Sequence, residues 1–477
     1  MRILRDNMKS LESFYSCNTM NMIVELTNAC NMRCKYCFEN YQTVERSTVV
    51  MTKDILKNSI DFLIQGRDNC HLTFFGGEPT ICKDLIIYAM EYGNQVAHEN
   101  GKYISYSIVT NGTLLDEEFI DELNNNNVNI VFSFDGNEFS QNKFRPMANG
   151  DGSFSIVNEN LKILLNKRKD ERFGHLIIRP TITADTLPLL NTIYHNLVNM
   201  GCKEVSFSLV SAKEEHSYAI NYDKLDSLRD AYSEMVDDYY AELQSGKSFN
   251  KFFEGILSRL TNRIASDKFC DCGKRYIAID AKGDVYPCEG FMGVEEYKIG
   301  NIIDKNIDKF VVNPQKVDEN DDCKNCWARH LCGGSCYHEA WMRTGSVDKR
   351  SPLVCETYRI SFEVALKLFS RLQDEEFNFD IVIKQGLLPE RSIPRIEEGK
   401  AKIISNSQVF VNDGMDFSII TLNETAFRIM ELCDGETTLS EITEIIMSEY
   451  QCDEDIYEDI CETICLLMKE NIIRLIV

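Results

Sequence analysis

The sequence contains no uninterrupted apolar run of about 18 residues, the length at which a transmembrane helix becomes a candidate. Its amino terminus, Met1–Asn7, also lacks the apolar stretch of a secretory signal. We therefore expect no membrane span and a cytoplasmic location. No internal repeat or low-complexity segment is present in the 477 residues, a length that suits two or three domains.

Positive charge is scarce in this chain. Lys and Arg number 51 against 75 Asp and Glu, so the net charge is −24. This balance argues against a nucleic-acid partner, because an acidic surface repels phosphates. The excess is uneven, since residues 401–477 hold sixteen acids and four bases, which is half of the net charge. This concentration indicates a separate acidic domain at the carboxyl end.

Cysteine, by contrast, is abundant, with 19 residues. Without a secretory signal these cysteines do not predict disulfides, and clustered cysteines in such a chain indicate metal ligands. Eleven fall into two clusters, one near the amino end and one at 270–355. The other eight are scattered, and we interpret them as small buried apolar residues: Cys17, Cys70, Cys82, Cys202, Cys433, Cys452, Cys461 and Cys465.

From residue 21 to about residue 210, strand-like runs alternate with amphipathic helical patterns. The expected strands are Met22–Leu26, His71–Phe75, Tyr103–Val109, Val128–Phe134, Leu176–Thr183 and Val205–Val210. The expected helices between them are 53–66, 84–100, 115–126, 153–169 and 186–200. This alternation predicts an α/β fold with a parallel sheet, and six such units fit a partial (β/α)6 barrel. In such barrels the chemistry gathers at the carboxyl ends of the strands.

The first cysteine cluster, Cys30, Cys34 and Cys37, directly follows the first expected strand. A strand and a tight CxxxCxxC loop bring three thiolates around one point, and soft sulfur ligands select iron–sulfur centres or zinc. Three ligands leave one metal position open for a substrate. The alternative is a zinc site that takes its fourth ligand from a distant part of the chain. With Tyr36 before the last cysteine, the loop resembles the radical SAM superfamily, in which S-adenosylmethionine chelates the open iron of a [4Fe-4S] cluster.

Further motifs at successive strand ends strengthen this resemblance. It implies that the Gly-Gly-Glu-Pro segment holds the amino group of S-adenosylmethionine and that the end of the fourth strand lies near the ribose. Arg179 is the expected partner of the cofactor's carboxylate, and Arg145 competes for that role. The cofactor-binding residues implied are Tyr36, Gly76, Gly77, Glu78, Pro79, Thr110, Asn111, Ser133, Asp135, Arg145 and Arg179.

The second cysteine cluster lies in a region with few regular patterns, which we expect metal rather than a hydrophobic core to hold together. Its spacing resembles the SPASM domain of peptide-modifying radical SAM enzymes, and a double zinc site is the alternative. The resemblance assigns an outer auxiliary cluster to Cys323, Cys326, Cys332 and Cys355. It assigns an inner auxiliary cluster to Cys270, Cys288 and Cys336.

Two residues beside the inner group depart from sulfatase maturases, where the paired cysteines before this segment are well separated. Cys272 lies one residue after Cys270 and is a candidate fourth ligand. We predict that it is not obligatory, which leaves one iron free to bind and deprotonate a substrate thiol. Glu289 occupies the place of an aspartate base in sulfatase maturases. It is our candidate catalytic proton acceptor, with a solvated glutamate as the alternative.

The acidic carboxyl end shows expected strands at 401–405, 408–412 and 417–421, followed by helical patterns at 423–433, 438–449 and 453–470. Its apolar pattern resembles the PqqD-like precursor-recognition domain, which adds a leader peptide to a sheet edge as an extra strand. An oligomerisation or packing domain is the alternative. The predicted organisation is a lead (1–20), a barrel (21–250), a SPASM domain (265–376), a linker (377–400) and a small winged-helix-like α+β domain (401–477).

Together these resemblances imply a radical SAM maturase of a ribosomally made, cysteine-containing precursor peptide with a leader. They imply three [4Fe-4S] clusters, S-adenosylmethionine, and flavodoxin or ferredoxin as electron donor. Thioether formation is the expected reaction. A formylglycine-generating sulfatase maturase and a non-catalytic iron–sulfur scaffold are the alternatives; the carboxyl-terminal domain weighs against the first, and the intact strand-end motifs weigh against the second.

Overall fold

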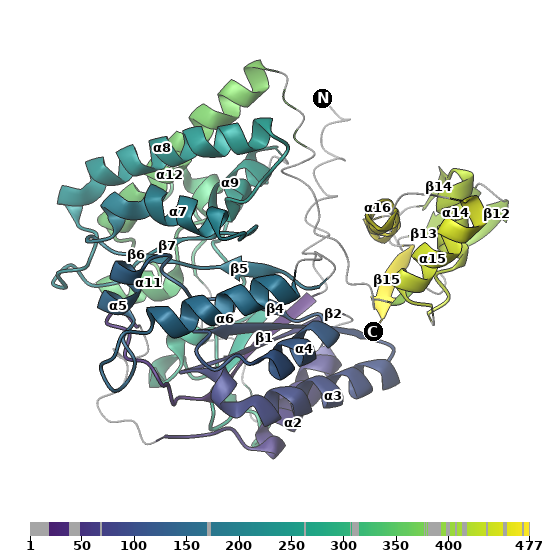
Figure 1. Cartoon of the computed structure of the whole chain (residues 1–477), viewed down its shortest axis with the longest axis horizontal. Helices are drawn as coiled ribbons and strands as arrows, with labels where there is room; N and C mark the ends of the chain where they lie inside the picture. The colour runs from purple at the N-terminus through teal and green to yellow at the C-terminus, as the bar shows by residue number, and fades with distance from the viewer. Residues whose placement is uncertain are drawn as a thin grey trace.

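The computed structural model comprises a large α/β body and a small carboxyl-terminal domain (Figure 1). It describes residues 19–37, 48–66, 69–168, 173–261, 264–305, 307, 314–375, 377, 379, 393–396, 401–405, 408–412, 417–435, 437–451, 456–469 and 472–476. Most of the expected lead and linker lie outside these residues. None of the described helices is long and apolar enough to cross a bilayer.

A twisted sheet in the order β10-β9-β8-β1-β2-β3-β4-β5 forms the centre of the body. Strands β1 to β5 pair in sequence and in parallel, which confirms the predicted βα architecture. Their bounds are β1 (Thr19–Thr27), β2 (Asn69–Gly76), β3 (Tyr103–Thr110), β4 (Asn129–Phe132) and β5 (Leu176–Ile178).

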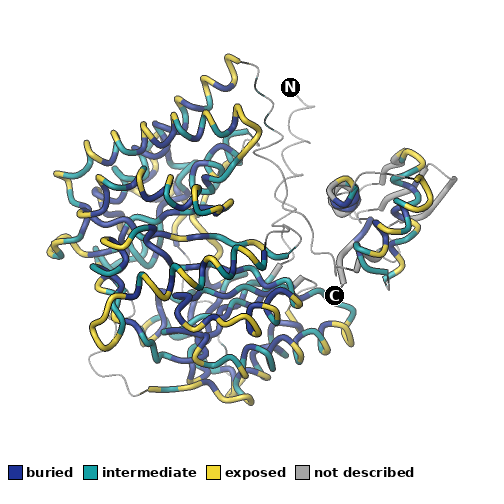
Figure 2. The backbone as a smooth tube through the Cα atoms, viewed as in Figure 1, coloured by how far each residue is buried: buried dark blue, intermediate teal, exposed yellow. Residues whose placement is uncertain are grey.

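Helices pack against this sheet, and their buried residues form the main hydrophobic core with alternate residues of the strands; the buried segments are dark blue in Figure 2. In β3, Ile104, Tyr106 and Ile108 face the helices, as the period of two in a strand requires. The covering helices lie close to their expected positions: α2 (Lys53–Gly66), α3 (Lys83–Glu99), α4 (Glu117–Asn125), α6 (Phe154–Lys167) and α7 (Leu190–Asn199). One short helix, α5 (Glu138–Phe144), was not expected.

The fifth and sixth expected strands are shorter than the sequence suggested. The fifth breaks at Pro180, which has no N–H to donate to a ladder, into β5 and β6 (Thr181–Ile182). The sixth retains only β7 (Ser208–Leu209). The backbone N–H of Ser208 still donates to the carbonyl of Pro180 over 3.0 Å, so the two runs remain side by side and parallel.

The cysteine-rich region corrects one expectation, because it is not held by metal alone. Its strands β8 (Tyr276–Ile279), β9 (Asp284–Tyr286) and β10 (Gly300–Asn301) extend the barrel sheet beyond β1. Strand β8 pairs in parallel with β1, and Ile277 and Ile279 join the main hydrophobic core. The region therefore shares its core with the barrel.

Four helices complete the body. The pattern expected over 223–266 is two helices, α8 (Leu225–Gln244) and α9 (Lys251–Thr261). The helix expected over 356–376 is α12 (Pro352–Asp374), which packs against both and begins early enough to carry Cys355 in its first turns. Before it comes α11 (Tyr337–Thr344), a short helix that follows Cys336.

The carboxyl-terminal domain contains the predicted three-stranded antiparallel sheet, in the order β12-β13-β14. Its elements are β12 (Ala401–Ser405), β13 (Gln408–Asn412), β14 (Phe417–Thr421), α14 (Glu424–Glu431), α15 (Leu439–Tyr450) and α16 (Tyr457–Lys469). An unexpected strand, β11 (Ile393–Ile396), pairs with β15 (Ile473–Ile476). The proposed linker therefore contains a strand of this domain, and the domain begins no later than Ile393.

Strand β15 also contacts β3 of the barrel. Tyr103, the first residue of β3, packs against the hydrophobic core of the carboxyl-terminal domain. The domain thus meets the barrel at the amino end of β3, while the cysteine loop follows the carboxyl end of the neighbouring β1.

Candidate functional site

Two glycines let the turn after β2 lie directly against the segment that leads into the cysteine loop. Gly76 has a φ of +142°, and a Cβ there would lie 2.3 Å from the carbonyl oxygen of Thr27. A Cβ on Gly77 would lie 2.3 Å from the carbonyl oxygen of Ala29. The close approach that these glycines permit is therefore to the chain's own backbone. Pro79 follows, buried in a short 3₁₀ turn.

Glu78 connects this turn to the end of β3 through hydrogen bonds. Its side chain is 1% exposed, and its carboxylate accepts hydrogen bonds from Thr80 N (3.1 Å), Thr80 Oγ1 (2.5 Å), Thr110 Oγ1 (2.7 Å) and Asn111 N (2.7 Å). Burial raises the pKa of the Glu78 carboxyl, and the hydrogen bonds oppose that rise. Oε1 accepts three of these hydrogen bonds and Oε2 accepts one, so Oε2 is the freer oxygen for an ammonium group at this turn.

A polar network from β3 surrounds the first cysteine. The Asn111 amide donates to Asn31 Oδ1 over 3.0 Å and approaches Cys30 Sγ at 3.9 Å, while its carbonyl accepts from Thr113. Burial raises the pKa of the Cys34 thiol; the charge of Arg145 opposes this, and the charges of Asp135 and Glu78 reinforce it. The structure thus brings the predicted motifs of β2, β3 and β4 around the CxxxCxxC loop.

Tyr36 takes part in a buried triad rather than facing outward. Its hydroxyl donates to Asp135 Oδ2 over 2.6 Å and accepts from Arg145 Nη1 over 3.2 Å. The same Arg145 nitrogen lies 3.9 Å from Asp135 Oδ1, and Thr181 N donates to that oxygen. Arg145 is therefore committed to Asp135 and Tyr36, which leaves Arg179 as the freer of the two candidate arginines. Ser133, the remaining predicted residue, bonds the end of β3 through its backbone N–H.

Arg179 extends from the end of β5 toward the cysteine-rich region. Its Nε donates to Ser208 Oγ over 3.0 Å, and its charge acts on Glu289. Glu289 in turn accepts a 2.8 Å hydrogen bond from the Tyr276 hydroxyl, and burial raises its pKa. The arrangement links the predicted cofactor arginine to the predicted proton acceptor, a connection that the sequence did not suggest.

The inner cysteines come together at one place, and Cys272 lies among them. Its side chain, 4% exposed, hydrogen-bonds the sulfur of Cys270, which lowers the pKa of Cys270 and raises that of Cys272. Cys288 and Cys336 are near enough to raise the pKa of Cys272 further. Cys272 is therefore positioned as a candidate fourth ligand of this group, and that it is not obligatory stays a prediction.

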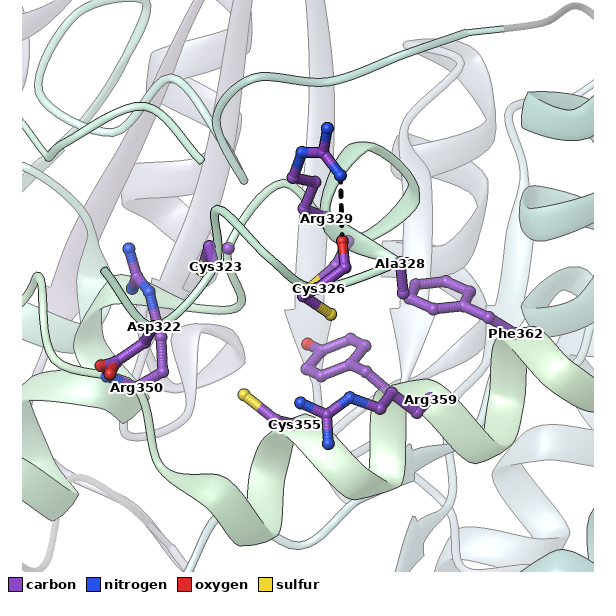
Figure 3. Close-up of a pocket in the computed structure, with 12 residues that line it drawn as sticks. Asp322, Cys323, Cys326, Ala328, Arg329, Arg350, Cys355, Arg359 and Phe362 are labelled. Carbon is purple, nitrogen blue, oxygen red and sulfur yellow. Dashed lines mark hydrogen bonds between the residues drawn. The ribbon is translucent and has the colours of Figure 1, made fainter. Parts of the chain in front are cut away.

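The outer cysteines line one pocket between a loop and α12 (Figure 3). Cys323 and Cys326 come from the loop, Cys332 ends the short helix α10 (Arg329–Cys332), and Cys355 faces them from α12. The remaining lining includes Arg350 and Arg359, neither of which the sequence analysis had singled out. In the sequence these two arginines flank Cys355, and that position is the signal that could have identified them.

Four thiols are a donor set that can hold an iron–sulfur cluster, and the four outer cysteines line one pocket. Within the described part of the chain, no three His, Cys, Asp or Glu side chains are grouped as a single metal ion requires.

Family comparisons divide the chain in the same way. Residues 24–193 match the radical SAM superfamily, residues 270–327 match an iron-sulfur cluster-binding domain, and residues 416–473 match coenzyme PQQ synthesis protein D. The second match ends before Cys332, Cys336 and Cys355, so for these three cysteines the grouping comes from the structure.

Two curated proteins are similar over most of the body. A cysteine-type anaerobic sulfatase-maturating enzyme from Clostridium novyi is 27% identical over 374 residues, covering 72% of this chain and 95% of that protein. The radical SAM cyclopropyl synthase TigE from Paramaledivibacter caminithermalis is 25% identical over 386 residues, covering 75% of each.

Among solved structures, native anSMEcpe with bound AdoMet and Kp18Cys peptide has a TM-score of 0.63 and 22% identity. The likeness covers 75% of this chain and 99% of that one, and it confirms the fold of the body. With the strand-end motifs, the cysteine clusters and the three domain matches in place, this chain is an enzyme that combines a radical SAM domain, which binds S-adenosylmethionine and an iron–sulfur cluster, with SPASM and PqqD domains.

Proposed function

We propose that this enzyme modifies a ribosomally made, cysteine-containing precursor peptide and forms a thioether between a cysteine sulfur and a carbon. The observation that carries the proposal is the PqqD match at 416–473 in the same chain as the radical SAM and SPASM matches. The sulfatase-maturating relative is matched over 95% of its own length by only 72% of this chain. The rest of this chain includes the carboxyl-terminal domain, and we place leader binding there.

The proposed cofactors are three [4Fe-4S] clusters and S-adenosylmethionine. The first cluster would be held by Cys30, Cys34 and Cys37, and S-adenosylmethionine would complete it. The two auxiliary clusters would be held by the inner and outer cysteine groups, Cys270, Cys272, Cys288 and Cys336, and Cys323, Cys326, Cys332 and Cys355. When bound, the first cluster and S-adenosylmethionine supply a 5′-deoxyadenosyl radical that removes a hydrogen atom from the substrate, after an electron arrives from flavodoxin or ferredoxin.

The protein's own residues position these groups. Glu78 accepts hydrogen bonds from Thr110 and Asn111 and so holds the turn after β2 against the end of β3. The same turn packs against the backbone at the start of the cysteine loop. Arg179 is the proposed partner of the cofactor carboxylate. Glu289 is the proposed acceptor of the substrate thiol proton, oriented by the hydroxyl of Tyr276.

Leader binding is assigned to the carboxyl-terminal domain. Strands β12 and β14 form the two edges of its three-stranded sheet, and an edge strand offers unpaired backbone groups to an extended peptide. The acidity of residues 401–477 favours a leader with basic residues near this edge.

The test uses anaerobically reconstituted protein, S-adenosylmethionine, a reductant and synthetic copies of the short cysteine-containing peptides encoded beside this gene. A thioether product lacks two hydrogen atoms and no longer reacts with a thiol alkylating agent. Formylglycine would instead appear as loss of sulfur and gain of oxygen, and that result would replace our proposal with the sulfatase-maturase alternative. Absence of 5′-deoxyadenosine under all conditions would favour a non-catalytic scaffold.

A truncated enzyme tests the role of the carboxyl-terminal domain. Deleting residues 393–477 removes β11 with the rest of the domain, and should leave reductive cleavage of S-adenosylmethionine intact. We expect kcat/KM for the leader-bearing peptide to fall by at least about tenfold, the equivalent of about 1.4 kcal/mol of lost binding. Normal processing of the full precursor by the truncated enzyme would show that the domain does not recruit the peptide.

A further inference from the structure

The inner and outer cysteine groups differ in the charged side chains around them. The outer pocket is lined by three arginines and one carboxylate (Figure 3): Arg329, Arg350, Arg359 and Asp322. Burial raises the pKa of the Cys323 thiol, and the charge and hydrogen bond of Arg350 oppose that rise. Arg359, one helical turn after Cys355, lines the same pocket, and the charges of Cys326 and Cys355 act to raise its pKa.

Arg350 is the more informative of the two because it is buried. Its side chain is only 4% exposed. Asp322 accepts the backbone N–H of Arg350 over 2.9 Å, but no ion pair of the Arg350 guanidinium is found among the described residues. Arg359, by contrast, pairs with Glu356 on the same helix. A buried guanidinium without an ion-paired carboxylate is strongly destabilising unless another anion lies close to it. Besides Asp322, the anions that this pocket offers are the thiolates of a four-cysteine cluster.

The surrounding structure holds Arg350 in place. Its Nη1 donates to the carbonyl of Val347 over 2.9 Å, and its guanidinium lies over the ring of Tyr337, 5.5 Å from the centroid. Gly334 provides the space, since a Cβ at that position would lie 3.3 Å from Nη2. The Nε atom is buried and has no hydrogen-bond partner. The side chain is therefore fixed beside the cysteines rather than free to swing toward solvent.

Around the inner group three carboxylates act on the sulfurs, and each has an arginine nearby: Asp271 pairs with Arg275, Glu339 pairs with Arg343, and the charge of Arg179 acts on Glu289. Asp271 and Glu289 act on Cys270, Glu289 acts on Cys288, and Glu339 acts on Cys336. Each of these interactions disfavours additional negative charge on the sulfur concerned.

Reduction adds one negative charge to a cluster, so a nearby cation stabilises the reduced form and a nearby carboxylate destabilises it. We propose that Arg350 is the counter-ion of the outer auxiliary cluster and holds its reduction potential above that of the inner one. This inference rests on the proposed assignment of the two auxiliary clusters. Arg350 is thus a positioning residue that acts through the cluster rather than on the substrate.

The test is a redox titration followed by electron paramagnetic resonance, on full-length protein carrying Cys30→Ala, Cys34→Ala and Cys37→Ala so that only auxiliary clusters remain. We expect two potentials. Arg350→Gln should lower the upper one and leave the lower one unchanged, while Arg350→Lys should keep the upper potential close to its original value. The matched control is Arg329→Gln: Arg329 lines the same pocket, but its Nε bonds Asp318 over 2.7 Å, so both potentials should stay unchanged.

Unchanged potentials in Arg350→Gln protein with full iron content would overturn the proposal, as would a lowered potential in the iron-replete lysine variant. If Arg350→Gln loses the outer iron, the lysine variant decides: retained iron and a retained upper potential support the requirement for positive charge. Failure of the proposed function gives a different result, because protein that binds no iron outside the first cysteine loop shows no auxiliary potential at all.

Discussion

The strand-end site of the barrel and the cysteine-rich region are built on different principles. In the barrel, the polar side chains of the site bind one another: Glu78 accepts four hydrogen bonds, and Asp135 is held by Tyr36, Thr181 and Arg145. In the cysteine-rich region the cysteine thiols lie close to one another, and the outer pocket adds the buried Arg350, whose guanidinium has no ion-paired carboxylate among the described residues.

This difference indicates which part of the molecule is complete without its cofactors. The barrel pairs its buried carboxylate Asp135 with Arg145, although Arg145 Nε has no hydrogen-bond partner among the described residues, so we expect the strand-end site to be organised before a cluster is inserted. The outer pocket leaves a cation and four thiols for an anionic metal group, so its stability should depend on that group. Four experiments, taken from the largest expected effect to the smallest, can break or sharpen this contrast.

The largest effect should come from removing the ligands of the first cluster. The triple variant Cys30→Ala, Cys34→Ala and Cys37→Ala should lose cleavage of S-adenosylmethionine entirely, because no site remains for the cofactor. It should keep about two-thirds of roughly twelve irons per chain, since the auxiliary groups are separate. Iron assay and quantification of 5′-deoxyadenosine measure the two outcomes. Cleavage that survives the three substitutions would refute the cluster assignment.

Cys272→Ala tests whether the inner group is a four-cysteine site. Because Cys272 is buried among the other three cysteines, we expect the variant to lose the inner cluster, about one third of the iron. Cys202→Ala is the control: Cys202 is equally buried but lies in the barrel core, and its removal should leave the iron content unchanged. A Cys272 variant with full iron and an unaltered inner spectrum would restore the three-cysteine site with an open iron.

Glu78→Gln tests the self-sufficiency of the barrel site. An amide cannot accept from all four donors that now meet the carboxylate, and a hydrogen bond to a charged group contributes about 1.5–3 kcal/mol. We expect the free energy of unfolding to fall by about 2–3 kcal/mol, measured by urea denaturation with and without iron. Glu118→Gln, on the exposed face of α4, should have little effect. If the loss appears only in iron-loaded protein, the site is not organised independently of its cluster.

The smallest effect concerns a charge pair at the start of β5. His175 Nδ1 lies 2.8 Å from Glu204 Oε1, and that hydrogen bond raises the pKa of His175. Since the pKa is higher in the folded than in the unfolded state, the stabilisation is complete below about pH 6.5 and is lost as the pH rises through the folded pKa.

The His175 side chain is 46% exposed, so solvent screens the pair and His175→Gln should destabilise the protein by less than about 1 kcal/mol. The loss should be larger at about pH 6 than at about pH 8.5. Thermal unfolding at the two pH values measures it, with His195→Gln as an exposed control that lies outside the sheet. Equal losses at both pH values would show that protonation of His175 contributes nothing.

Much of the fold could be predicted from sequence because the barrel strands follow local rules. The runs at β1, β2 and β3 alternate and lie between clear helical patterns, and β12, β13 and β14 fall where the pattern placed them. The cysteines and strand-end motifs were found for a similar reason, since their spacing is short and fixed. Individual roles within those motifs stay predictions.

The features that sequence could not reveal depend on partners far apart in the chain. Strand β8 is four residues long and is defined by pairing with β1, more than 250 residues earlier. Strand β11 contains Pro394 and is defined by pairing with β15. Likewise, neither the contact of Arg350 with Cys323 nor that of Arg179 with Glu289 follows from spacing, because each joins separate loops or strands.

The contact of Tyr103 with the carboxyl-terminal domain has a consequence for the length of the substrate. Strand β3 has eight residues, which at about 3.3 Å per residue separates its two ends by roughly 26 Å. A peptide anchored on a domain at the amino end of β3 and modified near its carboxyl end has to span at least that distance, or about eight extended residues. The length of the barrel would then set the minimum separation between the bound leader segment and the modified cysteine. Cysteines closer to the leader than this separation would stay unmodified.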